Sequence, residues 1–197
     1  MADGGVLGAV LAGGRSTRMR TPKALVELAG RPLISYPLAA LDDAGIEAIV
    51  VAKPDSPLPP LETRIVREPE LPLHPLAGVL AALDAVGGRA VIALGCDMPL
   101  VPPPLLEWLA GLDGTTALIE LRGRVQPLLA RYEPRAAAPL RAALARDESA
   151  TAAVLGLNPR VVGEQELAKF GDPELLAFNV NTPEELERAT RLLHREK

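Results

Sequence analysis

Short apolar runs alternate with helix-patterned segments in the first half of this chain, and this alternation constrains the fold more than any other feature. Strand-like runs lie at residues 6–11, 46–51, 63–66 and 90–94. Between them, residues 32–44 and 76–86 have helical spacing and are followed by Gly45 and by Gly87. Alternating strands and helices predict a mostly parallel sheet covered by helices. The expected fold class is therefore α/β, a Rossmann-like three-layer fold.

The second half of the chain departs from this alternation. Residues 117–121 and 125–132 flank Arg122-Gly123-Arg124 and have hairpin character, which predicts an antiparallel element in the C-terminal half. We expect one short helix that follows the proline run at residues 102–104 and ends at residue 109, and a second helix over residues 134–146. An irregular stretch to residue 159 and a short strand at 160–162 should follow. Thr182, Pro183 and Glu185 predict a capping box that opens a C-terminal helix.

Size and composition limit the kind of protein this can be. With 197 residues, 48% of them hydrophobic, the chain can bury one core, so residues 1–197 are expected to form a single domain. The net charge of −4 argues against a nucleic-acid partner. No apolar run approaches the roughly 18 residues that cross a bilayer, and no leader pattern opens the chain, so we expect a cytoplasmic protein without a membrane partner. One cysteine and two histidines argue against a disulfide framework or a zinc site.

The segment at residues 7–23, LGAVLAGGRSTRMRTPK, favours a nucleotide ligand. Gly13 and Gly14 lack a Cβ, so backbone N–H groups can approach an anion closely. Cations follow where a polyphosphate would lie, at Arg15, Arg18, Arg20 and Lys23. The spacing matches neither a P-loop nor a dinucleotide-binding loop. The alternative is an ordinary turn with solvated arginines.

Asp97 follows the strand-like run at residues 90–94 and precedes Pro99. In open α/β sheets, ligands bind beyond the carboxyl ends of the strands, and an acidic residue there can hold Mg²⁺ against substrate phosphates. The loop at Gly13 also follows a strand, so both are expected to face one crevice. The alternative is that Asp97 only caps the following turn.

Six motifs occur in order along nearly the whole chain. They are LAGGRSTRM with Lys23, AGRPLI at 29–34, PLAG at 75–78, CDMP at 96–99, QPL at 126–128 and NVNTPEEL at 179–186. In this order and spacing they resemble the molybdenum cofactor guanylyltransferases. Those enzymes belong to the wider nucleotidyltransferase superfamily, which also contains sugar-nucleotide and methylerythritol-phosphate enzymes.

The resemblance implies roles for the residues that match these motifs. Leu11, Ala12 and Gly13 would contact a guanine nucleotide through backbone groups, and Lys23 would contact its phosphates. Asp97 would contact both the nucleotide and Mg²⁺. The pair Asn179 and Asn181 matches a motif on the side where the molybdopterin substrate is thought to bind, although ordinary turn chemistry before a helix is the alternative.

The chain departs from this family in two places. Arg20 and Pro22 stand where the family usually has glycine and aspartate, and the segment there looks more like sugar-nucleotide enzymes. Family members also carry a nucleotide-contacting asparagine after the second strand and an aspartate before PLAG. The nearest candidates here are Lys53 or Asp55 for the first and Glu70 for the second.

The implied reaction is transfer of GMP from GTP to the terminal phosphate of molybdopterin, with release of pyrophosphate. The attacking phosphate is already ionised, so neutralisation of charge by Mg²⁺ at Asp97 and by Arg15, Arg18 and Lys23 would carry catalysis. Molybdoenzymes or cofactor-delivery proteins would receive the product. Three alternatives remain open: a CTP-using enzyme, a sugar-phosphate nucleotidyltransferase, and a non-catalytic protein that binds nucleotides or docks to a partner.

Overall fold

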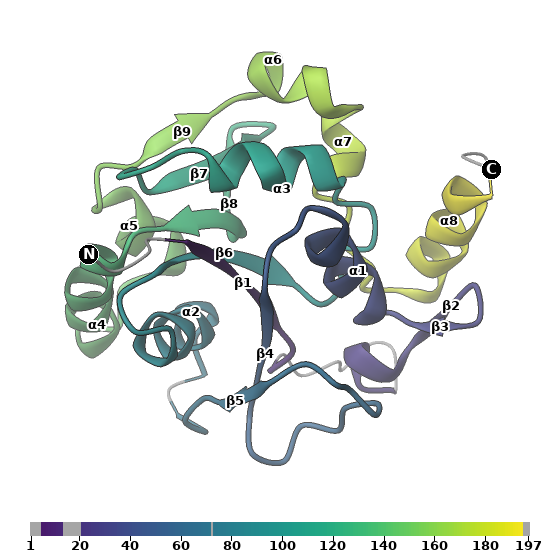
Figure 1. Cartoon of the computed structure of the whole chain (residues 1–197), viewed down its shortest axis with the longest axis horizontal. Helices are drawn as coiled ribbons and strands as arrows, with labels where there is room; N and C mark the ends of the chain where they lie inside the picture. Colours follow the sequence, from purple (N-terminus) through teal and green to yellow (C-terminus); the bar gives the residue numbers. More distant parts are fainter. Residues whose placement is uncertain (1–4, 14–20, 72, 195–197) are drawn as a thin grey trace.

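The core of the molecule is a twisted, mostly parallel sheet between two layers of helices, as the alternation predicts (Figure 1). The computed structural model describes residues 5–13, 21–71 and 73–194. Seven strands of these residues form the sheet in the order β5 (Ile65–Arg67), β4 (Ala48–Ala52), β1 (Val6–Leu11), β6 (Ala90–Gly95), β8 (Arg124–Tyr132), β7 (Ala117–Leu121) and β9 (Arg160–Val162).

The direction of the strands divides the sheet into two parts. Strands β5, β4, β1 and β6 run parallel to one another, so their carboxyl ends lie at one edge. Strand β8 runs antiparallel to both β6 and β7, and β9 is parallel to β7. Arg122 and Gly123, with φ of 51° and 69°, form the tight turn between β7 and β8. The predicted antiparallel element is therefore confirmed.

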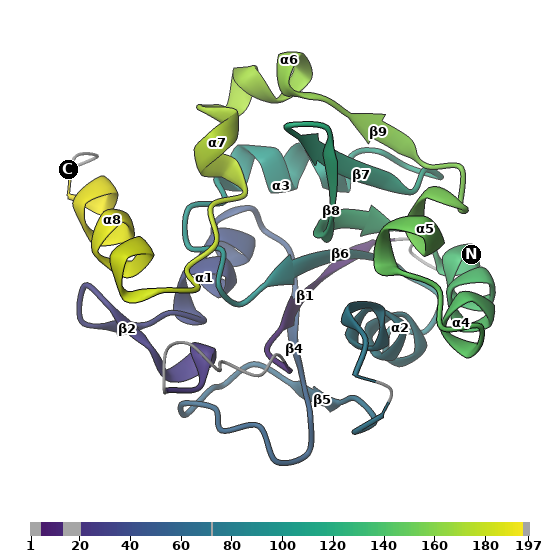
Figure 2. The same cartoon turned by 180° about the vertical axis from the view of Figure 1, so that it is seen from behind.

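The helices cover the sheet in two layers that Figures 1 and 2 show from opposite sides. One layer contains α2 (Pro75–Ala85), α4 (Ala137–Ala145) and α5 (Ala150–Leu155), and the other contains α1 (Ser35–Asp43) and α3 (Pro103–Ala110). Strand β1 serves both layers, because Leu7 and Ala9 are buried in the cluster with α2, whereas Val10 is buried in the cluster with α1 and α3.

The helix predicted over residues 32–44 begins later than expected. Pro32 belongs instead to a small hairpin of β2 (Glu27–Leu28) and β3 (Arg31–Pro32). The hairpin continues through a bond from the N–H of Leu33 to the carbonyl of Val26 (2.7 Å), and the Ser35 hydroxyl donates to the Pro32 carbonyl (2.6 Å). These bonds hold the residues before Ser35 out of the helix.

The stretch before residue 159 was expected to be irregular, and this prediction is wrong. It contains α5, whose first turn is capped by the Ser149 hydroxyl accepting from the N–H of Ala152 (3.2 Å). Helix α4 begins at Ala137, after a 3-10 turn η2 (Pro134–Ala136), instead of at Pro134. Three short helical elements after β9 were also not predicted, namely α6 (Glu164–Leu167), η3 (Ala168–Phe170) and α7 (Pro173–Leu176).

The C-terminal helix α8 (Pro183–Leu193) opens with the predicted capping box. The N–H of Glu185 donates to Thr182 Oγ1 (3.2 Å), and Glu185 Oε2 accepts from the N–H of Thr182 (3.0 Å). The helix lies beside the β2–β3 hairpin at one side of the molecule (Figure 2). Within the described ranges, no helix is long and apolar enough to cross a membrane.

Candidate functional site

Four neighbouring parallel strands each deliver one candidate residue to the same edge of the sheet. Gly13 follows β1, Lys53 follows β4, Glu68 follows β5, and Asp97 follows β6. Ligands of open α/β sheets bind beyond such carboxyl ends. The structure thus brings the Gly13 loop and Asp97 to one crevice, as the sequence predicts.

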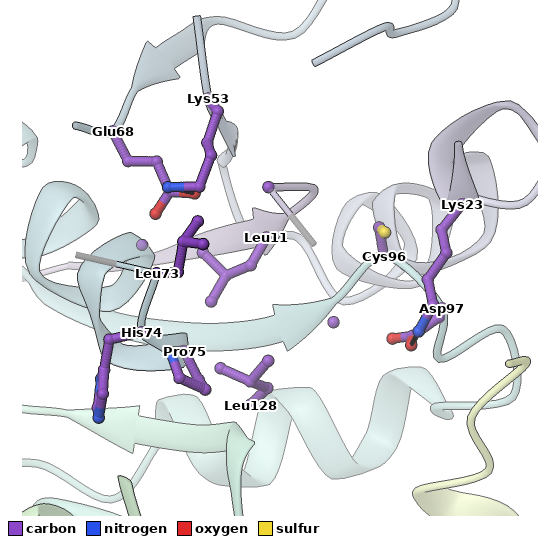
Figure 3. A pocket seen from close by; sticks show the side chains of 13 residues that line it. Leu11, Lys23, Lys53, Glu68, Leu73, His74, Pro75, Cys96, Asp97 and Leu128 are labelled. Atoms are coloured by element: carbon purple, nitrogen blue, oxygen red, sulfur yellow. Dashed lines mark hydrogen bonds and ion pairs between the residues drawn. The ribbon is translucent and has the colours of Figure 1, made fainter. Parts of the chain in front are cut away.

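A cavity of about 340 Å³ lies at this edge, with a different character at its two ends (Figure 3). Lys53 and Glu68 stand at one end, and Lys23 and Asp97 stand at the other. The wall between them is apolar and is formed by Leu11, Leu73, Pro75 and Leu128. The cavity can therefore hold an elongated ligand that is polar at both ends.

Lys23 and Asp97 form an ion pair at one polar end of the cavity. Lys23 lies in the 3-10 turn η1 (Lys23–Leu25), and its Nζ is 2.5 Å from Asp97 Oδ2. The two side chains are 20% and 15% exposed, so both remain accessible to a ligand. A Cβ added to Gly95 would lie 2.5 Å from Asp97 Oδ1. Glycine at position 95 therefore leaves room for the Asp97 carboxylate in its observed position.

The donor set at this end fits a magnesium ion shared with a phosphorylated ligand. No group of three or more His, Cys, Asp or Glu residues that could hold a metal occurs among the described residues. A cation at Asp97 would therefore have one protein carboxylate and would take its other oxygens from phosphates and water. Mg²⁺ is commonly bound in this way in phosphate-transferring sites.

Glu68 and Lys53 form the opposite polar end of the cavity. Glu68 Oε1 is 3.5 Å from Lys53 Nζ, and the Glu68 side chain is only 7% exposed. Its carboxylate lies against two glycines. A Cβ added to Gly13 would lie 1.9 Å from Glu68 Oε1, and a Cβ added to Gly78 would lie 3.2 Å from Glu68 Oε2. Glycines at these two positions therefore make room for a carboxylate on the cavity wall.

Lys53 is also tied to the loop that follows Glu68. Its ammonium donates to the carbonyls of Pro69 (2.9 Å) and Glu70 (3.1 Å). The N–H of Glu68 in turn donates to the carbonyl of Ala52 (3.0 Å), which continues the pairing of β4 and β5. These bonds fix the Lys53 ammonium and the Glu68 backbone, and the carboxylate lies between them through its 3.5 Å contact with Lys53.

Cys96 lines the cavity next to Asp97 but is not suited to be a nucleophile. Burial, and to a smaller extent the neighbouring Asp97 charge, raises the pKa of its thiol to about 12. A nucleophilic cysteine needs a lowered pKa, because the thiolate is the reactive form. Cys96 is therefore neutral at physiological pH.

The residues predicted from the sequence fall into three groups. Leu11, Gly13, Lys23 and Asp97 line the cavity, and Ala12 is buried between the first two. Asn181 Oδ1 accepts from Lys23 Nζ (2.5 Å), whereas Asn179 Nδ2 donates to the carbonyl of Ala177 (2.8 Å). Three predicted residues lie outside the described ranges, namely Gly14, Arg15 and Arg18, and so does Arg20.

Sequence reasoning missed Glu68. In the sequence, the nearest candidate for the family's acidic residue before PLAG is Glu70. In the structure Glu68 supplies the carboxylate on the cavity wall, and Glu70 contributes its carbonyl oxygen to Lys53. Lys53, a candidate from the sequence, does line the cavity. The signal that could have found Glu68 is its position directly after β5, which matches that of Asp97 beyond β6.

Comparison with known proteins gives the family. Residues 8–161 match the model of the MobA-like NTP transferase domain. The chain belongs to this family. A molybdenum cofactor guanylyltransferase of Cereibacter sphaeroides is 37% identical over 97% of this chain and 98% of its own length. A probable molybdenum cofactor guanylyltransferase of Chloroflexus aggregans is 32% identical over 91% of each chain. The resemblance stated from the motifs is confirmed, and this MobA-like chain is a nucleotidyltransferase.

Solved structures agree with this assignment. Molybdopterin-guanine dinucleotide biosynthesis protein A from Archaeoglobus fulgidus superposes with a TM-score of 0.78 at 27% identity, over 95% of this chain and 98% of that one. The 2-C-methyl-D-erythritol 4-phosphate cytidylyltransferase of Thermus thermophilus superposes with a TM-score of 0.68 at 20% identity, over 95% and 98% of the two chains. The second likeness concerns the fold alone. The MobA-like chain thus has the nucleotidyltransferase fold.

Proposed function

We propose that this enzyme transfers GMP from GTP to the terminal phosphate of molybdopterin, with Mg²⁺, and releases pyrophosphate. The observation that carries the proposal is the cavity with two polar ends. Its Lys23–Asp97 end suits a metal-bound triphosphate, and its Glu68 end suits a base that presents hydrogen-bond donors. The names of the full-length relatives support molybdopterin as the acceptor.

The buried carboxylate of Glu68 favours guanine over cytosine. An ionised carboxylate only accepts hydrogen bonds, and it has two oxygens with which to do so. The edge of guanine offers two neighbouring donors, its ring N–H and its amino group, whereas the amino group of cytosine stands beside a ring nitrogen that only accepts hydrogen bonds. Of these two bases, only guanine can therefore donate to both oxygens of Glu68. The apolar wall around Leu11 suits the flat faces of either base and does not distinguish them.

The residues at the other end position the phosphates and neutralise their charge. A bound Mg²⁺ supplies charge neutralisation on the phosphate oxygens. Asp97 is the residue that would hold it, and Lys23 would place its ammonium against the phosphates. The attacking phosphate of the acceptor is an anion already, so the reaction needs no general base. It also needs no protein nucleophile, and the neutral Cys96 thiol agrees with this.

Thermal unfolding with a panel of nucleotides tests the proposal. GTP with Mg²⁺ should raise the melting temperature of the wild type more than ATP, CTP or UTP does, because ligands that bind only the folded state stabilise it. In Asp97→Asn, which keeps the size of the side chain, the contribution of Mg²⁺ to that shift should disappear. A larger shift with CTP would favour a cytidylyltransferase, and no shift with any triphosphate would contradict the proposal.

A further inference from the structure

The side chain of Asn181 contacts Lys23, at the end of the cavity where Lys23 pairs with Asp97. Its Oδ1 accepts from Lys23 Nζ at 2.5 Å, across 158 positions of sequence. The same ammonium is 2.5 Å from Asp97 Oδ2. An ammonium has donors only, so the amide of Asn181 must present its oxygen to Lys23. Lys23 is thus held between a charged and a neutral oxygen acceptor.

The backbone of Asn181 is fixed on both sides. The N–H of Val180 donates to the carbonyl of Asp97 (2.9 Å), and the N–H of Asn181 donates to Glu185 Oε2 (2.7 Å). The first bond attaches the segment to the loop that carries Asp97, and the second attaches it to the first turn of α8. Neither bond requires an asparagine at position 181, because backbone groups make both. The side chain is therefore free to serve the contact with Lys23.

Lys23 and Asn181 are also supported by one apolar cluster. Val26 and Leu28, just after Lys23 in the chain, pack with Phe178 and Val180, just before Asn181. All four side chains are buried. The two polar residues therefore belong to one packed unit, and their separation is set by that packing.

We infer that Asn181 is a positioning residue of the nucleotide-phosphate site, where it holds the Lys23 ammonium beside Asp97. This inference rests on the proposed function and assigns Asn181 to the nucleotide and not to the acceptor. A divalent cation and Lys23 would compete for the carboxylate of Asp97, whereas Asn181 Oδ1 belongs to a neutral group that attracts such cations less. The Asn181 contact keeps Lys23 in place when Asp97 is engaged elsewhere.

Direct binding of GTP, measured by calorimetry with Mg²⁺ and without acceptor, tests this inference. Asn181→Ala should weaken GTP binding about 10-fold, the effect of losing one hydrogen bond to a charged group. Asn179→Ala is the matched control, because the Asn179 side chain bonds to the Ala177 carbonyl. Its GTP affinity should stay within about twofold of the wild type.

A double-mutant cycle with Lys23→Ala separates positioning from a general loss of structure. If Asn181 acts through Lys23, adding Asn181→Ala to Lys23→Ala should change GTP affinity less than twofold. Additive losses would overturn the inference, as would unchanged GTP affinity in Asn181→Ala with a raised KM for molybdopterin. Failure of the wild type to bind GTP would refute the proposed function itself, so the two failures are distinguishable.

Discussion

Replacement of Glu68 by glutamine changes one end of the cavity without changing its shape. The carboxylate is 7% exposed and faces the cavity between two glycines, so it would bind the base with little competition from water. Glutamine keeps one oxygen and places an NH₂ group opposite a guanine donor. The loss of one charge-assisted hydrogen bond and the unmatched donor together cost about 2–4 kcal/mol. GTP affinity should therefore fall about 30- to 700-fold.

Calorimetric titration of GTP with Mg²⁺ measures this effect directly. Glu70→Gln is the matched control, since Glu70 reaches the site through its backbone carbonyl, and it should bind GTP like the wild type. Inorganic tripolyphosphate has no base, so its affinity should be the same in all three proteins. If Glu68→Gln bound GTP within twofold of the wild type while remaining folded, Glu68 would not read the base.

Three further predictions concern the other side chains of the cavity. Asp97→Asn should abolish Mg²⁺-dependent turnover, and unchanged metal dependence in kinetic assays would place the ion elsewhere. Lys23→Ala should lower turnover strongly and the free energy of unfolding by about 1–3 kcal/mol, because it removes a partly buried ion pair and a hydrogen bond to Asn181; near-normal activity would exclude a phosphate contact. The pKa of Cys96 is raised from 9.0 to about 12, so the unfolded chain loses the thiol proton first and stability falls as pH rises above 9. Between pH 9 and 10, the free energy of unfolding measured in urea should fall by about 1 kcal/mol less in Cys96→Ala than in the wild type. Equal decreases in the two proteins would contradict this.

The parallel part of the fold was predictable because three of its strands, β4, β1 and β6, are buried on both faces and read as apolar runs. The β7–β8 hairpin was predictable from the turn at Arg122-Gly123. Helix α5 was missed, since six residues between loops give too short a pattern, and it depends on the Ser149 cap and on packing of Ala153 and Val154. The β2–β3 hairpin has two residues in each strand, and its existence depends on tertiary contacts.

The candidate site was predictable where a motif follows a strand directly. Gly13 and Asp97 are of this kind, and both line the cavity. Glu68 follows a strand of only three residues, whose end was not recognised at the right position. The contact of Lys23 with Asn181 had no sequence signal at all, because it joins residues 158 positions apart through the packing of the β2–β3 hairpin against the C-terminal segment.

Transfer of a labelled α-phosphate from GTP to molybdopterin tests the central claim most directly. With Mg²⁺, the wild type should form one labelled molybdopterin guanine dinucleotide for each pyrophosphate released, and CTP should be a poorer donor. Tight binding of GTP without any transfer to molybdopterin would contradict the claim.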